Sequence, residues 1–179
     1  MSGSKFVIRE ARVGDAEAIA RVYVESWRDT YPGILPTRAL VAMDVERQTA
    51  RWRSAIAMPG REAVLVAESK DAVLGMASLG RARDGGLGFD GEIYTLYVHP
   101  LATGNGIGRG LLRTGFDELA DRGYESCVIW AHAQNPARFF YQAMGGKLIA
   151  ERITSMMGAT VPEAAFGWKS LALVEASRT

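Results

Sequence analysis

Glycine occupies every second position from Gly104 to Gly110, between an apolar run and a leucine-rich segment (VHPLATGNGIGRGLL, residues 98–112). Glycine costs about 0.5–1 kcal/mol relative to alanine inside regular structure, so this density needs a reason. A strand that ends in glycines which then open a helix makes an anion site, because backbone N–H groups and the positive helix end converge where no Cβ blocks the approach. A tight turn with close helix–sheet packing is the alternative explanation.

Two widespread phosphate-binding loops do not match these residues. The dinucleotide fingerprint needs a third glycine three positions after the second, and Arg109 or Leu111 stands there. The nucleoside triphosphate loop needs Gly-Lys-Ser/Thr, a triplet that the sequence lacks. A NAD- or ATP-binding domain is therefore a remote alternative.

The composition indicates a globular protein with one hydrophobic core, and we expect a single domain over residues 1–179. The chain is 48% hydrophobic and 23% charged, with a formal net charge of +1. No basic block stands out, so we expect no nucleic-acid partner. The single cysteine, Cys127, and the two histidines, His99 and His132, exclude an internal disulfide and a Cys/His metal cluster.

The first residues, MSGSK, carry no apolar signal segment, and no run approaches the ~18 apolar residues of a membrane span. We therefore expect a cytoplasmic protein with no membrane partner.

Hydrophobic periodicity predicts helices and strands on both sides of the glycines. Ile19, Val22, Tyr23 and Trp27 recur at spacings of three and four, which predicts an amphipathic helix with Asp15 as its N-cap. Further helices are expected over 37–57, from the glycines to about 123, and from an Asn135-Pro136 start to 145. Strands are expected at 5–10, 62–69, 72–80, 92–98, 126–132, 147–155 and 163–171. This order predicts a mixed sheet, antiparallel in its first half, with a β-α-β crossover in its second.

The pattern Gly106-Ile107-Gly108, eight residues past Val98 and followed by Arg109 and two leucines, resembles the acyl-CoA loop of the GNAT superfamily of N-acetyltransferases. GEIYTLYVHP is similar to the fourth strand of that family, NPARFFYQAMGG to its Asn-to-Tyr helix, and VIREARVGDAEAIARVY to its first strand and helix. The resemblance covers nearly the whole chain in the family's order. It implies an α/β (α+β) fold with a mixed, mostly antiparallel seven-stranded sheet, flanked by helices and splayed between strands four and five.

The resemblance also implies acetyl-CoA as co-substrate, with its pantetheine arm in the splay. The backbone of Leu96, Tyr97 and Val98 would pair with the arm, and Asn135 would contact it besides capping its helix. Backbone amides would bind the pyrophosphate; they belong to Thr103, Gly104, Asn105, Gly106, Ile107, Gly108 and Arg109. Thr103 departs from the Gln or Arg usual in the family, so either coenzyme affinity is lower or Arg109 and Arg113 supply the positive field. A solvated position on the helix surface is the alternative for either arginine.

Acetyl transfer to an amine needs a base, because an alkylamine with a pKa near 10.4 is mostly charged at neutral pH. Glu92 stands fourteen residues before Gly106, where some members of the resembling family carry a general-base glutamate. Burial or a water relay would have to raise the basicity of this carboxylate. The alternatives are ordered water as the base, and a glutamate that only meets solvent or a neighbouring cation.

Tyr141 is the candidate that assists the leaving thiolate. Ala137, Phe140 and Met144 mark the core face of its helix, which leaves Tyr141 beside that stripe and able to point its hydroxyl into the cleft. A hydrogen bond to the developing thiolate would stabilise the departing sulfur, which is the role of a matching tyrosine in the resembling family. The alternative is a further core aromatic.

The remaining candidates concern the acceptor and the core. Trp27 and Tyr31 lie where the resembling family walls the acceptor site, and they offer an aromatic surface for a cation or an apolar side chain. Core packing is the alternative for Trp27. Cys127 is predicted to be a core residue, His132 is a second candidate for base or acceptor contact, and His99 is predicted to be structural.

These observations predict an acetyl-CoA-dependent N-acetyltransferase that acts on a primary amine, either a small molecule or a peptide. The alternative function is a non-catalytic acyl-CoA-binding sensor or interaction module on the same fold, which Thr103 and the open question of the base motivate. The apolar last strand, EAAFGWKSLAL, allows a homodimer.

Overall fold

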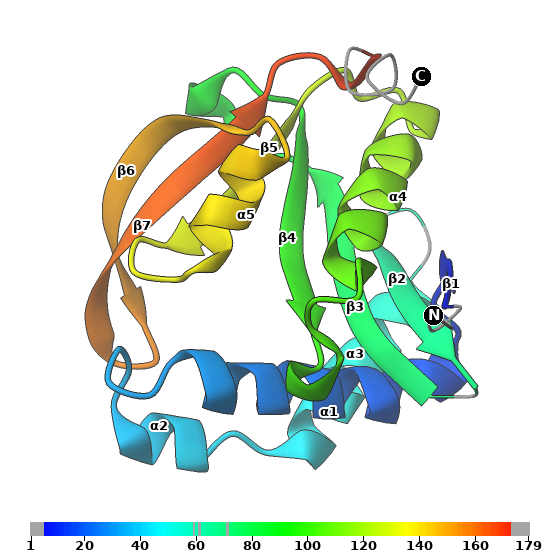
Figure 1. Cartoon of the computed structure of the whole chain (residues 1–179), viewed down its shortest axis with the longest axis vertical. Coiled ribbons are helices and arrows are strands. Elements are labelled where there is room, and N and C mark those ends of the chain that lie inside the picture. The colour runs from blue at the N-terminus through cyan, green and yellow to red at the C-terminus, as the bar shows by residue number, and fades with distance from the viewer. Residues whose placement is uncertain (1–5, 59, 61, 71, 173–179) are drawn as a thin grey trace.

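A single seven-stranded sheet forms the centre of the molecule in the computed structural model, which describes residues 6–58, 60, 62–70 and 72–172 (Figure 1). The strand order is β1-β2-β3-β4-β5-β7-β6, and only the β4–β5 pair is parallel. The strands are β1 (Val7–Glu10), β2 (Ala63–Ser69), β3 (Ala72–Arg81), β4 (Gly91–Val98), β5 (Cys127–His132), β6 (Lys147–Met156) and β7 (Ala159–Trp168). The predicted mixed, mostly antiparallel seven-stranded sheet is confirmed.

Helices cover both faces of this sheet. The helices are α1 (Ala16–Thr30), α2 (Thr37–Val41), α3 (Val45–Ala57), α4 (Ile107–Asp121) and α5 (Ala137–Ala143). Strand β2 shows the two layers, because Leu65 packs in the cluster under α4 while Val64 and Val66 pack in the cluster under α1 and α3. Among the described residues, no helix combines the length and the apolar character needed to cross a membrane.

Several element boundaries differ from the predicted ones. The region 37–57 forms two helices, because the Asp44 side chain accepts a hydrogen bond from the Arg47 amide and starts α3. Asp15 precedes α1, but its carboxylate binds Arg9 and the Arg12 amide instead of capping that helix. Lys5, the first residue of the strand predicted at 5–10, lies outside the described residues.

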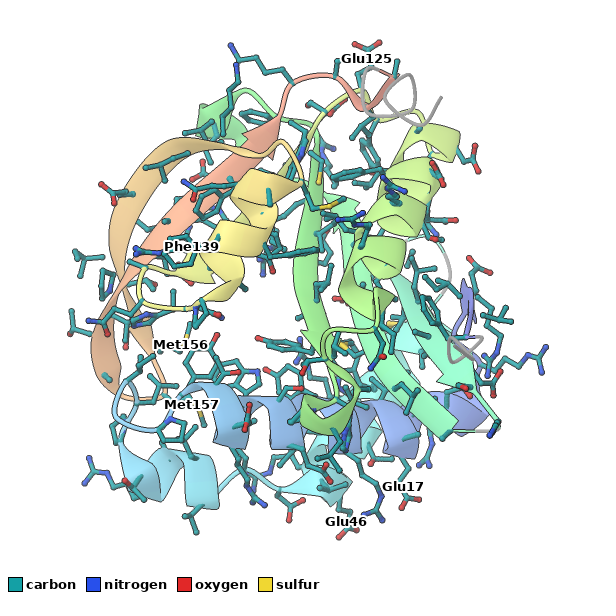
Figure 2. All side chains as sticks on the ribbon, in the orientation of Figure 1. Glu17, Glu46, Glu125, Phe139, Met156 and Met157 are labelled. Carbon is teal, nitrogen blue, oxygen red and sulfur yellow. The ribbon has the colours of Figure 1, made fainter. Side chains whose placement is uncertain are left out.

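The last strand begins at Ala159 rather than at residue 163 and ends at Trp168 rather than at residue 171. Met157 and Gly158 both have positive φ, +49° and +79°, and form the two-residue turn between β6 and β7. Such turns match the right-handed twist of the flanking strands, so the hairpin closes directly after Met156. The end of this hairpin, marked by Met156 and Met157, lies beside the segment that links α1 to α2 (Figure 2).

The glycines between β4 and α4 have different structural roles. Gly104 and Gly106 have φ of +78° and +80°, so they turn the chain into α4 in a conformation that other residues rarely adopt. Gly110 lies against β1, where an added Cβ would stand 2.7 Å from Ile8 Cδ1. The alternative explanation, a tight turn with close packing of the helix, therefore applies, with the turn at Gly104 and Gly106 and the packing at Gly110.

The β4–β5 pair is short and is fixed at one end. It comprises Gly91↔Cys127, Glu92↔Val128 and Ile93↔Ile129. Just before it, the Asp90 carboxylate accepts hydrogen bonds from the amides of Glu125 and Ser126 and from the Ser126 hydroxyl. Burial alone would raise the pKa of Asp90, but these hydrogen bonds hold it below its ordinary value.

Beyond Ile93 the two strands separate. The β3–β4 register shifts between Ser78↔Thr95 and Leu79↔Ile93, so Tyr94 is the extra residue of a β-bulge. A bulge bends the strand that carries it, and here it bends β4 where its pairing with β5 stops. The predicted splay between strands four and five is present.

Replacing Gly91 by alanine should destabilise the protein at the paired end of β4 and β5. The new Cβ would lie 2.7 Å from the Ser126 carbonyl oxygen and 3.2 Å from Leu119, which are backbone and well-packed core atoms. We expect the free energy of unfolding to fall by about 1–3 kcal/mol, the usual cost of overpacking. Urea denaturation followed by tryptophan fluorescence measures this change.

Gly85→Ala is the matched control, because an added Cβ at Gly85, in the connection that leads from β3 to β4, meets nothing within 4 Å. Its stability should stay within about 0.5 kcal/mol of the parent. Equal stability of the two variants would contradict the packing described for Gly91.

Candidate active site

A cavity of about 610 Å³ fills the gap between the separated strands. Its walls come from four parts of the fold: the bulged half of β4, the loop and first turn of α4, the middle of β5, and the facing ends of α1 and α5. The lining residues are Ser26, Thr30, Tyr31, 94–98, 102–104, 106–109, 129–131, Asn135, Ala137, Phe140 and Tyr141. The cavity therefore joins a helix N-terminus at one end to aromatic side chains at the other.

The α4 end of the cavity presents backbone N–H groups. The first intrahelical bond of α4 runs from the Gly110 amide to the Gly106 carbonyl at 3.0 Å, so the amides of Ile107, Gly108 and Arg109 precede the helical ladder. The helix dipole adds positive potential at this end. Arg109 is the only Lys, Arg, Asp or Glu among the described residues that line the cavity, so this end favours an anion.

Side chains of the loop hydrogen-bond within the loop and hold its shape. The Thr103 hydroxyl donates to the Pro100 carbonyl at 3.1 Å, and the Asn105 amide donates to the carbonyls of Ala102 and Thr103 at 3.2 Å each. His99 Nδ1 accepts from the Leu101 amide, and its Nε2 lies 2.7 Å from a Glu25 carboxylate oxygen. His99 thus has the structural role that was predicted.

Three tyrosines meet at the other end of the cavity. Tyr31 comes from the end of α1, Tyr97 from β4 and Tyr141 from α5. Burial raises the pKa of all three phenols, so each is a neutral hydroxyl at physiological pH. Asn135 links Tyr31 to the start of α5. Its side-chain NH₂ donates to the Tyr31 hydroxyl at 3.3 Å, and its Oδ1 accepts from the Ala137 amide at 2.9 Å.

Tyr141 has a fixed ring and an unengaged hydroxyl. The ring lies 5.4 Å from that of Phe140 and 5.9 Å from that of Phe166, inside the core cluster. Within the described part of the chain, its hydroxyl has no hydrogen-bond partner, and the residue lines the cavity. By contrast, Phe139 on the same helix is 59% exposed and points outward (Figure 2).

A sequence profile described as the acetyltransferase (GNAT) family matches residues 19–145. The chain belongs to the GNAT family of acetyltransferases. It is 34% identical over 169 residues to the uncharacterized N-acetyltransferase YuaI of Bacillus subtilis (strain 168), covering 94% of this chain and 95% of YuaI. It is also 34% identical over 152 residues to the L-amino acid N-acyltransferase MnaT of Escherichia coli (strain K12), covering 80% and 81%.

Solved structures show the same fold. The PaiA N-acetyltransferase of Thermoplasma acidophilum, in complex with coenzyme A, superposes with a TM-score of 0.70 at 22% identity and covers 92% of this chain and 99% of that one. YncA of Salmonella typhimurium, solved with its cofactor acetyl-CoA, gives a TM-score of 0.68 at 26% identity and covers 92% and 93%. As a GNAT member, this chain is an acyltransferase of a family that uses acetyl-CoA.

The structure brings most of the predicted GNAT site residues to one cavity. Those that line it are Tyr31, Leu96, Tyr97, Val98, Thr103, Gly104, Gly106, Ile107, Gly108, Arg109, Asn135 and Tyr141. Glu92, Asn105 and Trp27 are not among the lining residues. Trp27 packs between Tyr23 and Tyr31, with ring-centroid distances of 5.4 and 4.8 Å. This position agrees with the alternative expected for Trp27, that it packs in the core.

Glu92 lies away from the cavity, on the face of β4 opposite Ile93. Its carboxylate is 1% exposed and accepts hydrogen bonds from the Arg83 amide at 2.8 Å and from Arg83 Nε at 3.0 Å. This bonding raises the pKa of Arg83. Glu92 does not line the cavity and its carboxylate is engaged by Arg83, so the geometry favours the cation-partner alternative for Glu92.

His132 is also poorly placed to act as a base. Burial lowers its pKa, so the imidazole is neutral, and Nδ1 accepts a hydrogen bond from the Gln134 amide at 3.0 Å. The single ring proton therefore stands on Nε2, which leaves that nitrogen a donor. Cys127 is fully buried, as predicted. The described residues hold no group of three or more His, Cys, Asp or Glu suited to a metal ion.

Some lining residues were not predicted. Ser26 donates from its hydroxyl to the Val98 carbonyl at 3.1 Å and thereby ties α1 to the end of β4. Tyr94 is the bulge residue, and its hydroxyl donates to the Arg81 carbonyl at 2.6 Å. No short sequence pattern marks either role, because both depend on residues far apart in the chain.

Replacing Glu92 by glutamine should lower stability without removing catalysis. The substitution leaves the partly exposed Arg83 without its charge partner, and we expect a loss of about 1–2 kcal/mol in the free energy of unfolding. Arg83→Gln should cost more stability, about 3–5 kcal/mol, because it leaves the buried Glu92 carboxylate without its cation, and it should likewise leave catalysis in place. A fall in kcat of about 100-fold or more for Glu92→Gln alone, the typical effect of removing a general base, would contradict this placement.

Proposed function

We propose that the chain transfers the acetyl group of acetyl-CoA directly to a primary amine, with both substrates bound at once. The observation that supports this most is the single cavity that runs from the free amides of α4 to the Tyr141 hydroxyl between two separated strands. Family membership supports the acyl donor. The predicted homodimer and cytoplasmic location stay predictions.

The residues present suit this donor. The amides of Ile107, Gly108 and Arg109 would hold its diphosphate, as helix N-termini do. Beyond Ile93, the edge of β4 that faces β5 has no strand partner among the described residues, so Leu96, Tyr97 and Val98 would pair with the amide-bearing arm. The donor supplies an acetyl group on a thioester, which is activated for attack by nitrogen.

Transfer forms a C–N bond, breaks a C–S bond, moves one proton off the amine and puts one on the departing sulfur. Tyr141 would donate a hydrogen bond to that sulfur, because its hydroxyl is neutral and unengaged inside a mostly apolar wall. No carboxylate lines the cavity within the described residues, so we assign the amine proton to ordered water, the alternative to Glu92.

The acceptor would enter beside Tyr31, whose ring stands over the cavity with Trp27 packed behind it. A relative named an L-amino acid N-acyltransferase makes the α-amine of an amino acid the first acceptor to test. Small amines and short peptides complete the panel. Free thiol released from acetyl-CoA in the presence of each amine tests the function, and binding of acetyl-CoA without any release would indicate the sensor alternative.

Tyr141→Phe should lower kcat by about 10- to 100-fold, because the departing sulfur loses its hydrogen-bond donor. Coenzyme affinity should change little, since the ring and its packing remain. Stopped-flow thiol release under saturating substrates measures kcat. Tyr124→Phe is the control, because Tyr124 does not line the cavity. An unchanged kcat for Tyr141→Phe would overturn the role given to Tyr141.

The pH profile of kcat/KM should rise with pH and show no fall up to about pH 9.5. The rising limb reflects deprotonation of the acceptor, so an acceptor of lower amine pKa should shift it to lower pH. The Tyr141 pKa is raised above its ordinary value, so its acid form persists across this range. A falling limb below pH 9 that disappears in Tyr141→Phe would contradict the environment described for this phenol.

A further inference from the structure

Tyr94 and Trp130 stand where the cavity between β4 and β5 closes. The last residue pair of these two parallel strands is Ile93↔Ile129. Tyr94 and Trp130 are the next residue on each strand, and both line the cavity. Since the strands separate only beyond that pair, these two aromatic residues mark the closed end of the cavity.

An arginine lies over each of the two rings. The guanidinium carbon of Arg83 is 4.7 Å from the centroid of the Tyr94 ring, and that of Arg152 is 3.8 Å from the centroid of the Trp130 ring. The Tyr94 hydroxyl is held as well, because it donates to the Arg81 carbonyl at 2.6 Å. Cation–π contacts and this hydrogen bond therefore restrict the movement of both rings.

A buried glutamate holds each arginine in turn. Arg83 pairs with Glu92, and Arg152 Nε donates to a Glu163 carboxylate oxygen at 2.8 Å. The side chains of the two glutamates are only 1% and 9% exposed. Buried ion pairs are weak evidence of stabilisation, because desolvation of the charges offsets their attraction. These two pairs share a different consequence, which is that each fixes an aromatic ring at the closed end of the cavity.

The acyl group of the proposed donor would point at this closed end. The diphosphate would lie at the α4 amides, which follow Val98 along the chain, and the arm would lie along Leu96, Tyr97 and Val98. Tyr94 is four residues before Val98 on β4, about 13 Å away at the usual rise of a strand. A thioester beyond Leu96 is therefore directed toward Tyr94 and Trp130, and a longer acyl chain would meet their rings.

We infer that Tyr94 and Trp130 limit the transferred acyl group to acetyl and exclude longer acyl-CoA donors. This inference rests on the proposed function. The two residues determine specificity and are not catalytic, because they face the end of the acyl chain rather than the reacting atoms. A butyryl group has two more methylenes than an acetyl group, and a fixed ring would have to move to make room for them.

Binding of acyl-CoA donors tests this limit without an acceptor. Isothermal titration calorimetry measures the Kd of coenzyme A, acetyl-CoA and butyryl-CoA for the parent protein, Trp130→Leu, Tyr94→Leu and the control Phe139→Leu. Phe139 is 59% exposed on α5 and does not line the cavity. Coenzyme A carries no acyl group, so a Kd for coenzyme A like that of the parent shows that a variant is folded.

We expect the parent to bind butyryl-CoA at least about tenfold more weakly than acetyl-CoA, because displacing a fixed ring resembles overpacking a core. In Trp130→Leu and Tyr94→Leu this ratio should fall to about two or less, since the released space accommodates the added methylenes. Phe139→Leu should keep the parent ratio.

A parent that binds both acyl donors equally would overturn the inference and leave the proposed function intact. The same holds if the parent ratio persists in every cavity variant that still binds coenzyme A. If neither coenzyme A nor acetyl-CoA binds the parent at millimolar concentration, the proposed function itself fails.

Discussion

The site depends on one feature of the backbone, namely that β4 and β5 are joined at one end and apart at the other. Three residue pairs and the hydrogen bonds of Asp90 to the Glu125–Ser126 segment hold the joined end. The bulge at Tyr94 then bends β4 away. A parallel pair that continued would satisfy the backbone groups of both strands, whereas its early end leaves them available and opens the cavity between them.

The polar groups around this gap are arranged by charge. At one end the free amides of α4 and Arg109 favour an anion, and at the other end neutral phenols and an asparagine surround the space where transfer would occur. Two buried carboxylates on the strands that border the gap are held in ion pairs: Glu92 on β4 binds Arg83, and Glu163 on β7 binds Arg152. A donor with a phosphate tail and an uncharged thioester head matches this gradient from positive to neutral.

Much of the fold follows from local sequence patterns, because the glycines, the apolar periodicities and the Asn-Pro helix start each act within a few residues. The order of strands and helices and the glycine turn that opens α4 were predictable for this reason. The strand start at Ala159 was missed because Met157 in a left-handed turn conformation is an unusual choice for that position. The division of 37–57 depends on a single cap by Asp44.

The roles of individual side chains were harder to predict, since they depend on partners far away in the chain. Glu92 has a suitable position for a base along β4, yet the return of Arg83 across the strand end engages it. Trp27 has the aromatic character expected of an acceptor wall but lies one layer behind Tyr31. Gly110 belongs to the glycine-rich segment in sequence, but in the structure it allows α4 to pack closely against β1.

The most direct measurement is a ¹⁵N-edited NMR titration of the whole protein with coenzyme A. If the α4 N-terminus anchors the diphosphate, the backbone amides of Ile107, Gly108 and Arg109 will show the largest shifts in the spectrum and slower hydrogen exchange at saturation. If the ligand saturates the protein while these three amides keep their positions and exchange rates, the anchoring site lies elsewhere and the central claim is contradicted.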